Sequence, residues 1–152
     1  MAVADRLAEL GLTLPEVAAP VAAYVPALVD GDHVYVSGQL PFVDGVLPAT
    51  GKVGAEVSTE RAAELARLCA LNGLAAVASV VDLDSVRQVV KVTGFVASAP
   101  GYTDQPAVIN GASELLGAVF GDAGRHARSA VGVAELPKGT PVEVELIVRV
   151  AG

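Results

Sequence analysis

The end of the chain carries charged side chains on what the residue pattern predicts to be one face of a β-sheet. Residues 142–150 alternate between an apolar set and a polar set, and the polar set includes Glu143 and Glu145. In residues 128–134, Arg128 shares one face with the small residues Ala130 and Gly132, and Ser129, Val131 and Val133 share the other. Since successive side chains of a strand point to opposite faces, we expect Arg128, Glu143 and Glu145 on the face turned away from the helices. Charges beside small residues are suited to a concave site for one small anion, or to a close subunit contact.

The same pattern has a simpler interpretation of at least equal weight. If the two strands form an antiparallel hairpin, a register that places Arg128 opposite Glu145 is available, although one sequence does not fix it. Such a cross-strand ion pair on a solvated surface contributes only about 0.2–1 kcal/mol. Spacing alone therefore predicts either a site or a surface ion pair.

The elements that must position these residues follow from periodicity and turn residues. Asp30-Gly31-Asp32 between two β-rich runs is a hairpin signal. Helical spacing of apolar residues, a serine N-cap at Ser58 and a proline in the first turn after Gln105 predict two helices. The expected elements are strands at 24–29, 33–37, 86–97, 128–134 and 142–150, helices at 58–80 and 105–121, and a short helix at 4–10. This order predicts an α+β fold, one mixed sheet with two helices on one face, in a single domain over residues 1–152.

Composition favours an oligomer and counts against polyanionic partners. Hydrophobic residues make up 53% of the chain and aromatic residues only 4%, and such a surplus of small apolar residues is typical of an obligate subunit interface. The formal net charge of −7 predicts no nucleic acid partner and no membrane surface partner. The one cysteine, Cys69, allows no disulfide within the chain, and with no secretory signal or spanning segment predicted, we expect a cytoplasmic protein.

Other candidate residues carry weaker signals. Cys69 is expected to be a core residue on an apolar helix face, and His33 and His126 have no second His or Cys at metal-ligand spacing, so no metal and no cofactor are predicted. Ser37 without a base is more often a turn residue. Asn110 is equally well interpreted as a helix residue that satisfies a loop backbone.

Several motifs occur together in an order that resembles one protein family. They are Tyr24 before the hairpin, Ser37-Gly38-Gln39-Leu40-Pro41, Asn110, Ala127-Arg128-Ser129, Leu136-Pro137 and Val142-Glu143-Val144-Glu145. This series is similar to the pattern of the YjgF/RidA family and covers most of the chain, from about residue 24 to residue 150. The strings around Asn110 and Arg128 resemble a subgroup with a longer N-terminus, here residues 1–20.

The resemblance implies a fold, an assembly and a reaction. The fold is the chorismate-mutase-like fold of the Bacillus type, and the assembly is a homotrimer with sites between subunits. The reaction is the hydrolysis of reactive 2-imino acids to 2-keto acids and ammonia, without a cofactor. A binding module that senses a small keto or amino acid without chemistry is the alternative, and ribonuclease activity, attached to some relatives, is disfavoured by the acidic charge.

The resemblance also implies roles for particular residues. Arg128 would hold the substrate carboxylate, and Glu145 would position or deprotonate the attacking water. Tyr24, Ser37, Gly38 and Asn110 would line the pocket, with Tyr24 and Ser37 supplied by the neighbouring subunit.

Two positions depart from the family pattern. Ala130 stands where relatives often have Cys, which excludes a thiol nucleophile and leaves a backbone carbonyl to contact the substrate. His126 stands where Pro is usual, and it is predicted either to carry a proton or to be a polar neighbour of Arg128.

Overall fold

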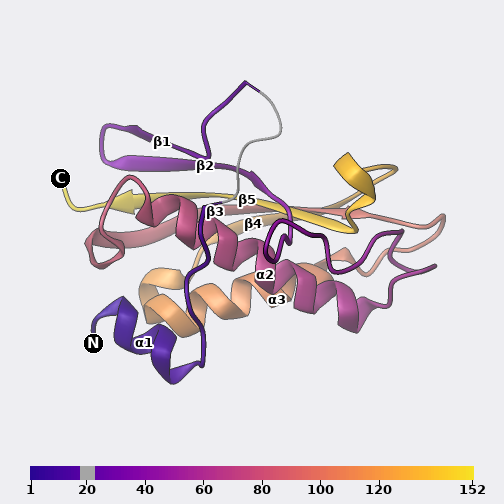
Figure 1. The fold of residues 1–152 in the computed structure, drawn as a ribbon, viewed down its shortest axis with the longest axis horizontal. Helices are drawn as coiled ribbons and strands as arrows, with labels where there is room; N and C mark the ends of the chain where they lie inside the picture. The colour runs from indigo at the N-terminus through magenta and orange to yellow at the C-terminus, as the bar shows by residue number, and fades with distance from the viewer. Residues whose placement is uncertain (18–22) are drawn as a thin grey trace.

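The structure, a computed structural model, describes residues 1–17 and 23–152 and contains one five-stranded sheet with helices on one of its faces (Figure 1). The strands are β1 (Ala27–Asp30), β2 (His33–Gln39), β3 (Val86–Ala97), β4 (Ala127–Val133) and β5 (Val142–Val150). The helices are α1 (Val3–Glu9), α2 (Thr59–Ala78) and α3 (Gln105–Phe120), with short 3-10 turns at Leu83–Ser85, Gly121–Gly124 and Pro137–Gly139. The predicted α+β fold with two helices on one face of a mixed sheet is confirmed.

The helix ends lie where the sequence signals place them. Ser58 is the N-cap of α2, and its side chain accepts a hydrogen bond from the Arg61 amide at 3.1 Å. Pro106 lies in the first turn of α3, and Gly121, with a φ of 63°, ends that helix. These signals fix α3, and therefore the residues that α3 presents to the neighbouring strand.

The strand order β1-β2-β5-β3-β4 differs from the hairpin considered for the last two strands. Among the described strands, β4 pairs with β3 alone, in parallel, while β5 pairs antiparallel with β2 and β3. The register that places Arg128 opposite Glu145 is therefore wrong. The physical reason is the crossover through α3, which returns the chain parallel to β3 and leaves β4 at the edge of the sheet.

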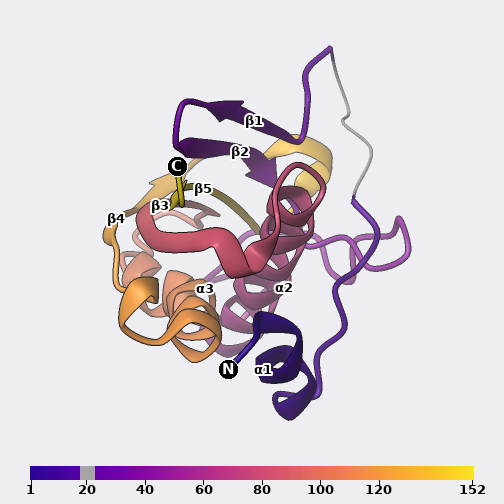
Figure 2. The same cartoon turned by 90° about the vertical axis from the view of Figure 1, so that its left-hand side faces the viewer.

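Helices α2 and α3 cover one face of the sheet, and the core lies between these helices and the sheet (Figure 2). The predicted inward set of β5 is buried throughout: Val142, Val144, Leu146, Val148 and Val150. Leu65 and Leu74 of α2 and Ile109 and Leu116 of α3 are fully buried against this face. Within the described part of the chain no helix lies over the opposite face of the sheet, and we call it the open face.

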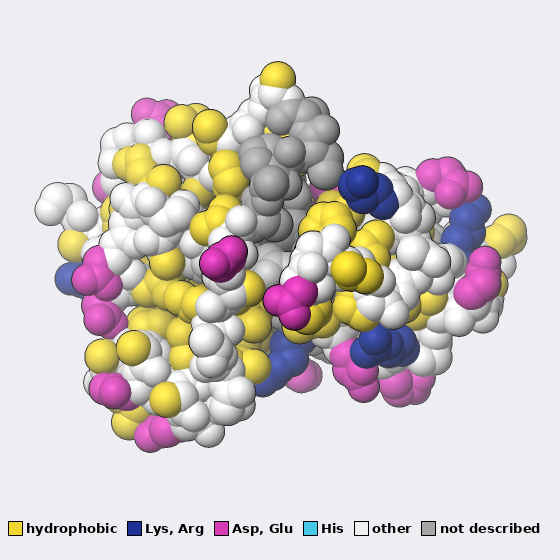
Figure 3. Space-filling model, viewed as in Figure 1, with side chains coloured by type: hydrophobic (Ala, Val, Ile, Leu, Met, Phe, Trp, Pro, Cys, Tyr) yellow, Lys and Arg dark blue, Asp and Glu magenta, His cyan; other side chains and the backbone are white. Residues whose placement is uncertain are grey.

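Helix α1 is attached to the helix layer. Val3 and Leu7 are buried, the Val3 amide donates to Asp84 Oδ1 at 2.8 Å, and Arg6 donates to the Ala118 carbonyl at 3.2 Å. A depression of about 500 Å³ lies between α1 and the end of α2, where apolar side chains gather (Figure 3). The predicted end of the N-terminal extension, at residue 20, lies outside the described residues.

Within residues 1–17 and 23–152, no helix is both long enough and apolar enough to cross a membrane.

Candidate active site

The sheet register separates Arg128 from Glu145. Arg128 is in register with Val92, which is fully buried under the helices, so Arg128 points to the helix side of the sheet. Glu145 is in register with Thr93 on the open face. The expectation that Arg128 shares a face with Glu143 and Glu145 is wrong. That expectation assumed that the valine-bearing face of each strand packs against the helices. In the edge strand β4 the valines lie on the other face, and Val131 is 42% exposed.

On the helix side, Arg128 is held by three acceptors beside α3. Its Nη1 donates to Asn110 Oδ1 at 2.8 Å and to Ser113 Oγ at 3.2 Å, and its Nη2 donates to the Pro106 carbonyl at 3.3 Å. Asn110 and Ser113 are three residues apart on the helix and so share a face. A guanidinium has five N–H donors, and these contacts leave Nε–H and one Nη2–H, on neighbouring nitrogens, for a further acceptor. The side chain is oriented while part of its donor edge is kept for a carboxylate.

His126 lies in the same cluster. Its Nε2 is 2.9 Å from Ser113 Oγ, and its Nδ1 is 2.6 Å from the Gly124 carbonyl oxygen. Ala130 follows Arg128 on the same face and packs against the core. The structure thus brings together Arg128, Asn110, His126 and Ala130 of the predicted residues. We call them, with Ser113, the edge group.

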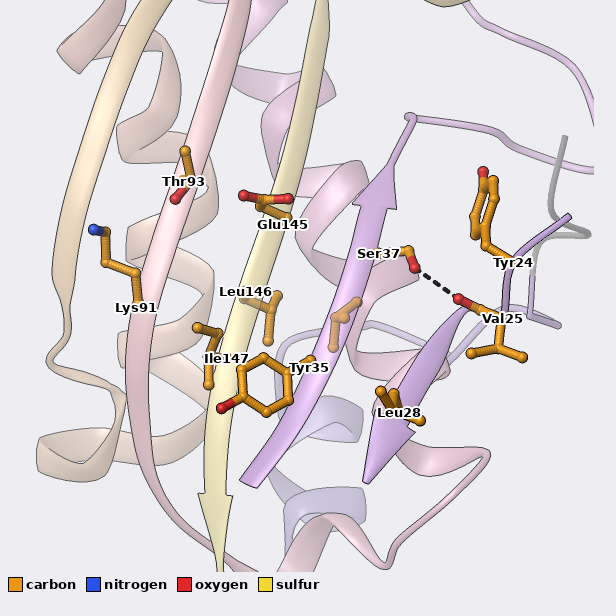
Figure 4. A pocket seen from close by; sticks show the side chains of 11 residues that line it. Tyr24, Val25, Leu28, Tyr35, Ser37, Lys91, Thr93, Glu145, Leu146 and Ile147 are labelled. Atoms are coloured by element: carbon orange, nitrogen blue, oxygen red, sulfur yellow. Dashed lines mark hydrogen bonds between the residues drawn. The ribbon is translucent and has the colours of Figure 1, made fainter. Parts of the chain in front are cut away.

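On the open face, Tyr24, Ser37 and Glu145 line a depression of about 310 Å³ (Figure 4). Ser37 Oγ donates to the Val25 carbonyl at 2.6 Å, which ties β2 to the segment before β1. Three further polar side chains line the depression without having been predicted, namely Tyr35, Lys91 and Thr93. The depression combines a carboxylate, an ammonium group and hydroxyl groups.

Glu143 lies two residues before Glu145 on β5, and its carboxylate lies against Gly38. A side chain at residue 38 would meet the Glu143 carboxylate, which would have to move away. Burial raises the pKa of the half-buried Glu143, and the negative charge of Glu145 two residues along raises it further. Glu143 therefore holds a proton more readily than a solvated glutamate does. Tyr24, Ser37, Gly38, Glu143 and Glu145 form what we call the open-face group.

The raised pKa of Glu143 predicts a dependence of stability on pH. A carboxyl whose folded pKa exceeds its unfolded pKa contributes stability below the unfolded pKa, and this contribution is lost as the pH rises through the folded pKa. Glu143→Gln should therefore raise the melting temperature at pH 7.5 and leave it nearly unchanged at pH 4. Glu114→Gln, at an exposed position of α3, is the control. Equal shifts for Glu143→Gln at both pH values would contradict this account.

Neither a metal centre nor a reactive thiol is found among residues 1–17 and 23–152. No three His, Cys, Asp or Glu side chains converge there to hold a metal ion. Cys69 is fully buried, and burial, followed by the charge of Glu143, raises its thiol pKa. A thiol held protonated in the core is inert.

Comparison with known proteins agrees with this fold. Residues 4–148 match the family model described as "YjgF/chorismate mutase-like, putative endoribonuclease". Protein TCP17 of Trypanosoma cruzi is 46% identical over 149 residues, which cover 97% of this chain and 93% of that protein.

Two solved structures are also similar. The Agrobacterium tumefaciens protein Atu1372, of unknown function, is 48% identical with a TM-score of 0.91, over 98% of this chain and 92% of that one. E. coli TdcF with bound serine is 27% identical with a TM-score of 0.59, over 87% of this chain and 91% of that one. With a family model matched over nearly all of its length, this chain belongs to the YjgF/RidA family.

Proposed function

We propose that this protein hydrolyses small 2-imino acids to 2-keto acids and ammonia, without a cofactor, in the cytoplasm. The proposal rests on the environment of the Arg128 side chain. Three acceptors orient its guanidinium, and N–H donors on two adjacent nitrogens are left for a ligand. Such a fork binds both oxygens of a carboxylate. The serine bound to E. coli TdcF, a similar protein, supports a small carboxylate as the ligand.

The site is formed between two subunits of a homotrimer in this proposal. The edge group has a carboxylate binder but no acidic side chain, whereas the open-face group has two carboxyls, Glu143 and Glu145. One subunit would supply the edge group and its neighbour the open-face group, which includes Tyr24 and Ser37. Exposed apolar side chains on the uncovered sheet, such as Leu28 at 57% and Tyr35 at 43%, support a subunit contact on this face.

In the proposed reaction, Arg128 fixes the carboxylate and the imine carbon faces the carboxyls of the neighbouring subunit. Water adds to that carbon while Glu145 takes one of its protons. Glu143 gives its proton to the nitrogen, which completes a carbinolamine. The hydroxyl proton of this carbinolamine then passes to the nitrogen, the carbon–nitrogen bond breaks, and ammonia and the keto acid leave. The proton on Glu145 returns to Glu143 through solvent, so no net proton is consumed by the protein.

The experiment that tests the proposal measures assembly and turnover in one preparation. We expect light scattering to give the mass of three 15.3 kDa chains. The same protein should speed the loss of 2-iminobutyrate, made in situ by an amino-acid oxidase and followed by semicarbazide trapping. A monomer at micromolar concentration, or a rate equal to that in buffer, would exclude the proposal.

A second candidate function is binding without turnover. The same Arg128 donors that support catalysis would serve a sensor of 2-keto acids or amino acids. Binding of 2-ketobutyrate that Arg128→Ala abolishes, in a protein that does not turn over imines, would favour it. Ribonuclease activity, although the family description mentions it, is disfavoured by a net charge of −7.

A further inference from the structure

Ser113 and His126 are polar members of the edge group that touch no reacting atom in the proposed imine reaction. Ser113 lies in the middle of α3, half-buried, with its Oγ 2.9 Å from His126 Nε2 and 3.2 Å from Arg128 Nη1. His126 Nδ1 is in turn 2.6 Å from the Gly124 carbonyl oxygen. Four groups from α3, the following turn and β4 thus form one continuous chain of hydrogen bonds.

The chemistry of the end groups fixes the direction of every bond in this chain. The Gly124 carbonyl can only accept, so His126 Nδ1 carries the proton, and in the neutral ring Nε2 is an acceptor. Arg128 can only donate, so it donates to Ser113 Oγ. The remaining hydroxyl proton of Ser113 therefore points to His126 Nε2. A serine that donates to an imidazole whose other nitrogen is anchored has the arrangement by which a base activates a hydroxyl nucleophile.

We propose that Ser113 and His126 form a nucleophile–base pair that gives this protein an acyl-transfer activity on small activated esters. The guanidinium of Arg128 lies against the Ser113 oxygen, where positive charge stabilises both the alkoxide and the oxyanion formed next to it. Asn110 accepts from Arg128 Nη1 through Oδ1 at 2.8 Å, which holds the guanidinium in this position. The proposal requires neither Glu143 nor Glu145 and is independent of imine hydrolysis.

The steps balance with water as the only co-reactant. Ser113 Oγ attacks the ester carbonyl carbon and its proton passes to His126 Nε2. The bond to the leaving alcohol breaks, and the alcohol oxygen takes the proton from His126. Water then attacks the acyl group, gives a proton to His126, and the acid leaves as Ser113 Oγ recovers that proton. The enzyme returns to its starting state.

The test uses diisopropyl fluorophosphate, which phosphorylates a serine activated in this way with loss of fluoride, together with the hydrolysis of 4-nitrophenyl acetate. We expect the purified wild-type protein to be labelled at Ser113, as located by peptide mass spectrometry, and to release nitrophenolate. His126→Gln should slow both reactions by about 10²-fold or more, since a positioned general base contributes about 10²–10⁴. Ser129→Ala, at an exposed serine of β4, is the matched control and should behave as wild type.

Several results would overturn the proposal. They are the absence of a label in the wild-type protein, a label on a residue other than Ser113, and equal labelling rates for wild type and His126→Gln. Any of them would leave Ser113 as a residue that only positions Arg128. Circular dichroism of Ser113→Ala and His126→Gln shows whether each variant is folded, and Ser113→Thr, which keeps the hydroxyl, provides a second measure should Ser113→Ala be unstable.

Discussion

Replacing Arg128 by alanine should lower kcat/KM for 2-iminobutyrate by about 10²–10³ or more. The variant loses two charge-assisted hydrogen bonds to the substrate carboxylate, each contributing about 1.5–3 kcal/mol. Arg128→Lys keeps the charge but not the planar fork, and a lysine cannot donate at once to Asn110, Ser113 and both carboxylate oxygens. We therefore expect the lysine variant to recover only part of the activity in a steady-state assay.

A matched control for this substitution lies three residues away. Arg125 is exposed, and its side chain has the same charge, so Arg125→Ala reports the effect of losing one positive charge from the same surface. It should leave kcat/KM within a few-fold of wild type. Full activity of Arg128→Ala, in a folded protein of unchanged mass, would show that the carboxylate binds elsewhere.

Replacing Glu143 by glutamine should lower kcat by about 10²–10⁴ while KM changes little. Glutamine keeps the shape of the side chain against Gly38 but cannot hold or release a proton, and that range is typical for the loss of a general acid or base. The raised pKa of Glu143, caused by burial and by the charge of Glu145, is what suits this carboxyl to donate to the leaving nitrogen.

Glu145→Gln is the informative comparison, because the family resemblance implies the water-activating role for Glu145 alone. In our account both carboxyls take part, so both glutamine variants lose activity. Wild-type kcat in Glu143→Gln, together with a large loss in Glu145→Gln, would return the proton chemistry to Glu145 and contradict the role of Glu143.

Much of the fold could be predicted from the sequence, because local signals mark its elements. The β-branched run at 86–97 and the alternation at 142–150 coincide with β3 and β5, and the cap at Ser58 marks the start of α2. The pairing of β4 could not be predicted, because an edge strand and a hairpin strand have the same local pattern and only the crossover through α3 distinguishes them.

The sequence predicted which residues belong to the candidate site better than it predicted how they are arranged. Arg128, Asn110 and His126 do lie together, and so do Tyr24, Ser37 and Glu145. The prediction of the sheet face on which Arg128 lies was wrong, because it depended on the position of β4 in the sheet. Ser113 was missed although its spacing of three from Asn110 places it on the same helix face. Lys91 is hidden within a β-branched run, and no local signal marks it as a site residue.

The most direct test of a shared imine-hydrolysing site is to mix the two inactive variants Arg128→Ala and Glu143→Gln. If Arg128 acts with Glu143 of the neighbouring subunit, each mixed trimer contains one interface at which both residues are intact. Unfolding the variants together in equal amounts and refolding them should then restore about a quarter of the wild-type imine hydrolysis, as expected for random closed trimers. Activity no higher than that of the variants refolded separately would contradict the account, because it would mean that the two residues act within one subunit or in different sites.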